Sequence, residues 1–70
     1  MEYSLEVVTV EGSRHFTPWG VMSDEELTQT HNFLKQITEM KYFHMETDAG
    51  TAYFNPAHVV SVTLRKREAE

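Results

Sequence analysis

Two stretches of the chain, residues 5–23 and 43–61, repeat one pattern without a gap between matched positions. Internal repetition narrows the possible folds more than any single residue, because each copy is expected to form the same local unit. The matched residues lie 38 positions apart: Thr9 with Thr47, Gly12 with Gly50, Phe16 with Phe54, and Pro18 with Pro56. The repeat therefore predicts two similar β-hairpins.

Each copy combines a turn glycine with a proline that ends the returning strand. Gly12 and Gly50 each end a predicted three-residue turn, where a positive φ favours glycine. A proline cannot donate a ladder hydrogen bond, so it stops the strand two residues after the aromatic. The predicted cross-strand pairs are Val7 with His15 and Glu6 with Phe16 in the first hairpin, and Met45 with Tyr53 and His44 with Phe54 in the second.

Length and composition limit how much core this chain can build. With 70 residues and no cysteine, residues 1–70 form one small domain that no disulfide can stabilise. The apolar fraction of 40% and charged fraction of 24% are typical of a folded domain. No membrane span or signal peptide is evident, so we expect a cytoplasmic protein without membrane association.

A helix between the two hairpins is predicted from its start signal. Ser23 and Glu26 have the spacing of a capping box, and the helix is expected to run to Thr38 or Glu39. Its apolar stripe contains Leu27, Leu34 and Ile37, which suits packing on a sheet.

Alternating patterns predict the strands. We expect strands at 3–9, 14–16, 41–47, 51–54 and 58–65, followed by a frayed, charged tail at 65–70. In the last strand, Val60 and its alternate residues are predicted to point inward. The bracketing of this strand by Pro56 and the charged tail predicts that it is a sheet edge.

The predicted fold class is α+β. A small, bent antiparallel sheet of five strands, in the order ββαβββ, carries one helix packed on one face. The first two strands form a β-hairpin, and the three strands after the helix are predicted to form an antiparallel meander. One helix cannot cover both faces, and the predicted registers leave Phe16 and Phe54 on the uncovered face. Either a homodimer covers that face, or the sheet curls into a partial barrel.

The candidate interaction residues are mainly aromatic. Trp19 follows Pro18 in a loop, where it either covers the core or anchors a partner. The full set of predicted interaction residues is Phe16, Trp19, Tyr42, Phe54 and His58.

No residue pattern indicates an enzyme, a cofactor or a native metal site. His44 and Glu46 share a strand face, and His58 could approach them across the sheet. These three residues are the closest approach to a set of metal ligands in the sequence. The chain has no glycine-rich phosphate loop and no cysteine nucleophile. We therefore expect a protein without catalytic activity.

The end of the second repeat, Gly-x-x-Tyr-Phe-Asn-Pro-x-x-Val-Val-Ser-Val from Gly50, resembles a pattern in small bacterial and phage β-proteins, including FlbD-like flagellar proteins. The resemblance covers about a dozen residues, lacks a counterpart to the helix, and implies no function.

The leading hypothesis is a small protein-interaction module that forms a homodimer. The alternative is a nucleic-acid-binding accessory protein, in which exposed aromatics and Arg65-Lys66-Arg67 would contact bases and phosphates. The net charge of −5 opposes that alternative. A small-molecule or metal-binding protein is the third possibility.

Overall fold

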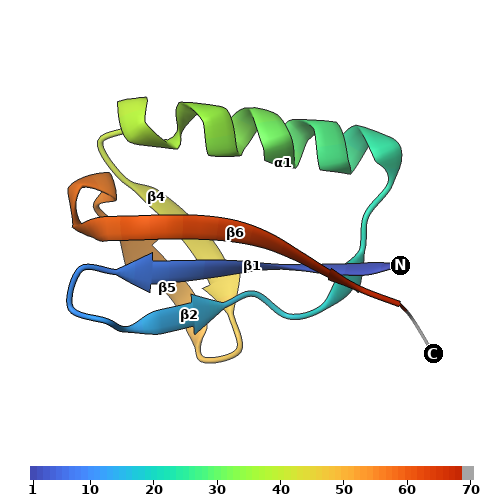
Figure 1. Ribbon diagram of the computed structural model, residues 1–70, viewed down its shortest axis with the longest axis horizontal. Coiled ribbons are helices and arrows are strands. Elements are labelled where there is room, and N and C mark those ends of the chain that lie inside the picture. Colours follow the sequence, from blue (N-terminus) through green and yellow to red (C-terminus); the bar gives the residue numbers. More distant parts are fainter. Residues whose placement is uncertain (69–70) are drawn as a thin grey trace.

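The computed structural model describes residues 1–68 and places α1 beside two antiparallel sheets (Figure 1). The predicted order of elements, ββαβββ, is confirmed, with one additional strand of two residues before the helix. The elements are β1 (Glu2–Thr9), β2 (Arg14–Phe16), β3 (Gly20–Val21), α1 (Asp24–Gln36), β4 (Phe43–Thr47), β5 (Gly50–Phe54) and β6 (Val59–Arg67), with 3₁₀ turns at Ile37–Glu39 and Pro56–His58.

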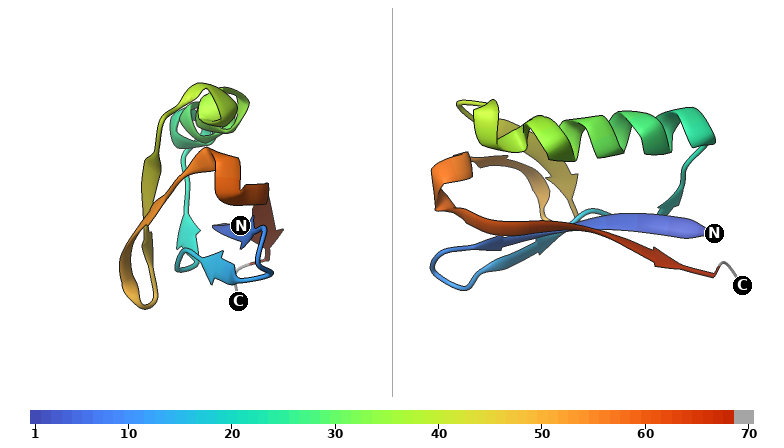
Figure 2. Two further views of the ribbon diagram at one scale, coloured as in Figure 1. Left: turned by 90° about the vertical axis from the view of Figure 1, so that its left-hand side faces the viewer. Right: turned by 45° about the horizontal axis from the view of Figure 1, so that its top comes forward.

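The strands divide between two sheets instead of forming one bent sheet. β1 is central in the larger sheet, where β2 and β3 pair along one side of it and β6 pairs along the other. β4 and β5 form a separate hairpin. The predicted three-stranded meander is therefore wrong: β6 pairs with β1 and not with β5, because the 3₁₀ turn at Pro56–His58 carries the chain from one sheet to the other. Figure 2 shows this hairpin facing the larger sheet, with α1 lying across the side where the two sheets separate.

The helix begins at the predicted capping box. The Glu26 backbone N–H donates to Ser23 Oγ at 3.1 Å, and the Ser23 backbone N–H donates to Glu26 Oε1 at 3.3 Å. The α-helix ends at Gln36, and a 3₁₀ turn extends it to Glu39, the predicted limit. No helix in the described part of the chain is long and apolar enough to cross a membrane.

The two repeated hairpins differ in their turns. The first has the predicted register, with Val7 opposite His15, and Gly12 adopts a φ of 91°. The predicted second register is wrong by one residue, since Thr47 pairs directly with Gly50. Thr47 Oγ1 donates to the Gly50 carbonyl at 2.8 Å and accepts from the Ala49 N–H at 3.2 Å, which closes a shorter turn.

This shift by one residue places Phe54 opposite Phe43 and Tyr53 opposite His44. Because successive side chains of a strand point to opposite faces, Phe54 turns toward the core and Tyr53 turns away from it. The prediction that Phe54 lies on an uncovered face with Phe16 is therefore wrong.

β6 also departs from its predicted pattern. A bulge where Val8 pairs with Ser61 and Thr9 pairs with Val59 leaves Val60 without a partner in β1. Val59 packs against the core, whereas Val60 is 66% exposed, the reverse of the prediction. Residues 65–67, predicted to belong to a frayed tail, continue β6, and residues 69–70 of that tail lie outside the described residues.

The core is small and lies between the two sheets. Its buried apolar residues, among those described, are Val7, Phe43, Met45 and Phe54. The rings of Phe43 and Phe54 stack with centroids 5.2 Å apart, and Phe33 of α1 meets Phe43 edge to face. Neither α1 nor β6 contains a buried residue, so the apolar side chains that these two elements direct toward each other remain partly exposed.

Candidate functional site

The predicted interaction residues do not form one surface. Phe54 is only 8% exposed and belongs to the core. Phe16 is half-buried on the outer face of the larger sheet, beside Trp19. Tyr42 lies next to β4 with 66% of its surface exposed, and His58 lies in the 3₁₀ turn before β6.

Trp19 packs against arginines of β6. The Arg65 guanidinium lies 4.4 Å from the Phe16 ring centroid and 4.5 Å from that of Trp19, and the Arg67 guanidinium covers Trp19 at 4.3 Å. Arg65 Nη2 also donates to the buried Ser4 Oγ at 2.9 Å. Trp19 is thus a half-buried cover of the outer sheet face, held by cation–π contacts.

The same face carries carboxylates that pair with two of its arginines, Arg14 and Arg67. Glu2 accepts from Arg67 at 3.0 Å, and Glu6 accepts from Arg14 at 3.2 Å. An arginine already paired with a carboxylate is less available to a phosphate, because the existing pair must first be broken. The arginine-aromatic stack therefore lends little support to nucleic-acid binding.

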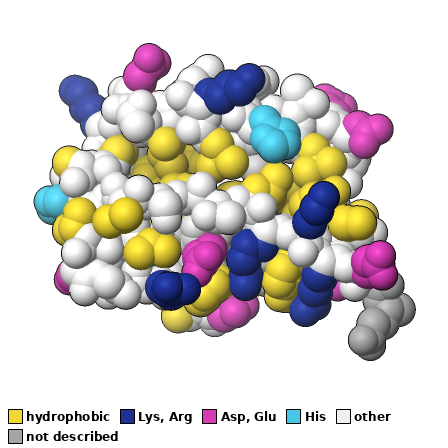
Figure 3. All heavy atoms as spheres, in the orientation of Figure 1, with side chains coloured by type: hydrophobic (Ala, Val, Ile, Leu, Met, Phe, Trp, Pro, Cys, Tyr) yellow, Lys and Arg dark blue, Asp and Glu magenta, His cyan; other side chains and the backbone are white. Residues whose placement is uncertain are grey.

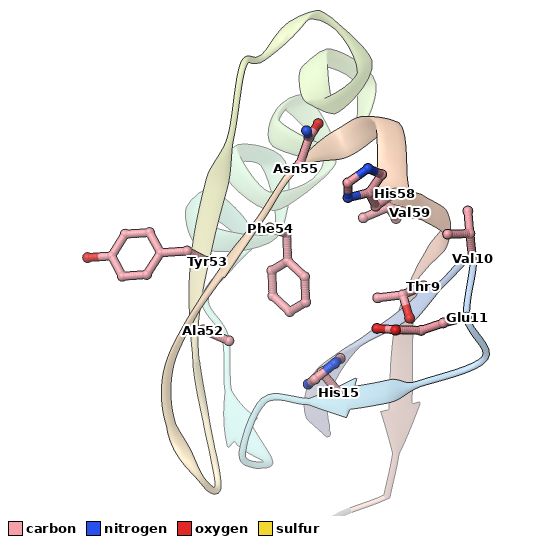
Figure 4. Close-up of a pocket in the computed structure, with 10 residues that line it drawn as sticks. All are labelled: Thr9, Val10, Glu11, His15, Ala52, Tyr53, Phe54, Asn55, His58 and Val59. Atoms are coloured by element: carbon pink, nitrogen blue, oxygen red, sulfur yellow. The ribbon is translucent and has the colours of Figure 1, made fainter.

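The outer face of the β4–β5 hairpin is a second exposed aromatic surface. Tyr53 is 71% exposed, and its ring lies 5.4 Å from that of His44. Figure 4 shows Tyr53 directed away from the side of the hairpin that bears Phe54. The ligand set His44, Glu46 and His58 is not assembled, and the described residues contain no metal-binding cluster of three histidine or acidic side chains.

β6 has an unpaired edge. Within the described residues it pairs only with β1, and the backbone groups of Leu5 and Thr9 in β1 bond to the opposite side, at Thr17 and Ser13. Antiparallel residues alternate in the direction of their N–H and C=O groups, so Ser4, Glu6 and Val8 of β1 direct theirs toward β6. The β6 residues that direct backbone groups outward are then Val62, Leu64 and Lys66.

An apolar groove follows this edge. Figure 3 shows hydrophobic side chains gathered between α1 and β6. One hollow of about 210 Å³ and another of about 330 Å³ occupy this groove. Most of their lining is apolar: Leu34, Ile37, Pro56, Val59, Val60 and Val62 in the first, and Tyr3, Leu27 and Leu64 with His31 and Lys66 in the second.

A hollow larger than these two lies elsewhere, between the first hairpin turn and β5 (Figure 4). Its volume is about 550 Å³. It is lined by Phe54 and His58 of the predicted interaction set, and also by Glu11 and His15, which are not in that set. Its lining consists of Thr9, Val10, Glu11, His15, Ala52, Tyr53, Phe54, Asn55, His58 and Val59.

Comparison with known proteins adds no relative: no family model, no curated protein and no solved structure matches the chain.

Proposed function

We propose that this protein is a self-association module without catalytic activity, and that two copies form a homodimer by pairing their β6 edges. The observation that carries the proposal is the unpaired edge of β6 beside an apolar groove, since neither element flanking that groove contains a fully buried residue. An unpaired strand edge is a template for a second strand.

The composition of β6 favours an antiparallel pair of copies. With Thr63 opposite its own copy, Val62 would pair with Leu64, and Arg65 would pair with Ser61. Val62 and Leu64 both direct backbone groups toward the edge, as a hydrogen-bonded pair requires. Registers that set Arg65 opposite itself are disfavoured by like-charge repulsion.

A homodimer would also compensate for the small hydrophobic core of the single chain. A domain of this size buries about 60% of its unfolded surface, and here only four apolar side chains are buried among the described residues. Covering the groove would remove Leu34, Ile37 and Val60 from water, each gaining roughly 25 cal/mol for every Å² of apolar surface.

Light scattering tests the proposal directly. The parent chain at micromolar concentration should scatter as about twice its mass of 8.2 kDa. Val60→Asp should shift the scattering mass toward the monomer, because it places a carboxylate in the apolar groove. Val21→Asp is the matched control, since Val21 is 75% exposed but does not line the groove.

A parent chain that remains monomeric at high concentration would contradict the proposal. Equal scattering masses for Val60→Asp and Val21→Asp would show that the two copies meet at another surface. The expected cytoplasmic location is part of the same proposal, and fractionation of cells that express a tagged chain would test it.

A further inference from the structure

The hollow between the first hairpin and β5 has the size and the fixed walls of a ligand site. Its volume of about 550 Å³ lies within the ~300–1,000 Å³ typical of small-molecule pockets. The Val10 N–H donates to the His58 carbonyl at 2.8 Å, which joins the hairpin turn to the 3₁₀ turn. Asn55 Oδ1 accepts from the Ala57 N–H at 3.0 Å and fixes the start of that turn. The walls are therefore tied together by hydrogen bonds of the chain itself.

Three polar side chains face this pocket with unused bonding capacity. Figure 4 shows the carboxylate of Glu11 reaching inward from the turn, with the rings of His15 and His58 on opposite sides of the pocket. None of these three side chains forms a hydrogen bond or an ion pair with another residue among 1–68. A neutral imidazole offers one donor and one acceptor, whereas a carboxylate accepts only.

The opposite wall is aromatic. The ring of Phe54 extends into the space between the two histidines, and His15 meets it edge to face with centroids 5.1 Å apart. Ala52 and Val59 extend the apolar lining on either side. This wall suits a flat or aromatic molecular body, because aromatic rings gain about 0.5–1.5 kcal/mol from such contacts beyond their burial.

The charges of the lining residues indicate the charge of the polar group that a ligand would carry. Glu11 is the one acidic residue that lines the pocket, and neither lysine nor arginine is among the lining residues. An anionic ligand would face repulsion from Glu11, whereas a ligand cation would gain a charge-assisted hydrogen bond. The described residues form no metal-binding cluster here.

We propose that this pocket binds a small aromatic amine, with its ammonium group against the Glu11 carboxylate and its ring against Phe54. This site lies apart from the α1–β6 groove, so it is independent of the proposed homodimer: the two lining sets share only Val59.

Phenethylamine is a suitable probe, with hydrocinnamate as an anionic counterpart of similar size. Titration of phenethylamine into the isotopically labelled chain should give saturable amide shifts confined to the pocket, at Thr9 to Glu11, Phe54 and His58. Hydrocinnamate should bind at least tenfold more weakly, because its carboxylate would approach Glu11.

Glu11→Gln should weaken phenethylamine binding about tenfold, since a hydrogen bond to a charged group becomes one to a neutral amide. Glu25→Gln is the matched control, because Glu25 is an exposed acidic residue of α1. This variant should bind phenethylamine with the affinity of the parent chain. Val60→Asp should also retain binding, which separates this result from the test of the dimer.

Equal binding of the amine and the acid by the parent chain would overturn the proposal without any variant. An unchanged affinity in Glu11→Gln, or no saturable shift at millimolar amine, would overturn it as well.

Discussion

His15 and Phe54 meet edge to face, and this contact joins the two sheets, because His15 belongs to β2 and Phe54 to β5. Phe54 also stacks on Phe43 within its own hairpin. One buried ring therefore contacts both walls of the molecule, although no backbone ladder connects β2 with β5.

Phe54→Ala should destabilise the fold by about 3–5 kcal/mol, the usual range for deleting a buried aromatic ring. A small domain has only about 5–15 kcal/mol in total, so the variant should be close to unfolded at room temperature. Urea titration measures the change. Tyr53→Ala, at the adjacent exposed position, should change the free energy of unfolding by less than about 0.5 kcal/mol.

Gly12→Ala and Gly50→Ala should each destabilise by about 1–2 kcal/mol. The φ angles of these residues are 91° and 117°, and a side chain in this region is strained even though no atom lies within 4 Å of the added Cβ. Gly20→Ala is the control, because Gly20 has equal space and no positive φ. Thermal melts in which all three variants coincide would show that the turns tolerate side chains.

Ser23→Ala should cost roughly 0.5–2 kcal/mol, since it removes the side-chain acceptor for the Glu26 N–H at the helix start. Asn32→Ala, at an exposed site within the same helix, should be neutral or slightly stabilising because alanine favours helices. Circular dichroism during thermal unfolding compares the two. A stable Ser23→Ala would mean that the cap contributes nothing.

Arg65→Lys should destabilise by about 1–2 kcal/mol although the charge is kept. Lysine lacks the planar guanidinium that lies between Phe16 and Trp19. The fluorescence emission of Trp19 should also change in the Arg65→Lys variant. Arg14→Lys is the control, since the Arg14–Glu6 pair is exposed and such pairs contribute about 0–1 kcal/mol. Identical melts for both variants would exclude a structural role for the stack.

Local signals in the sequence were sufficient for every element except the two-residue β3, and for the order of the elements. The capping box of Ser23 located the helix start, and glycine located both turns. The second register could not be predicted, because Gly50 has a positive φ in a shorter turn that the Thr47 hydroxyl closes. The bulge that turns Val60 outward likewise depends on pairing with β1, not on the pattern of β6 itself.

The candidate sites could be predicted from the sequence only in part. Pro56 and the charged tail correctly indicated that β6 is an edge, and β6 pairs with β1 alone among the described strands. The pocket brings Glu11 and His15 to His58, and only the tertiary arrangement of the two hairpins does this. The internal repeat led to the wrong prediction that Phe16 and Phe54 share one face. These matched positions lie on different surfaces because the two turns differ.

The pairing of β1 with β6 has a consequence for synthesis on the ribosome. Glu2 lies opposite Arg67, so the larger sheet joins residues that are 65 positions apart in the chain. β1 is synthesised before β6, and among the described strands of this sheet only β2 and β3 can pair with it in the meantime. Pairing across such a separation is slow, since the intervening loop must close before any contact compensates for it. The nascent chain therefore remains open along one side of β1 until translation has passed β6.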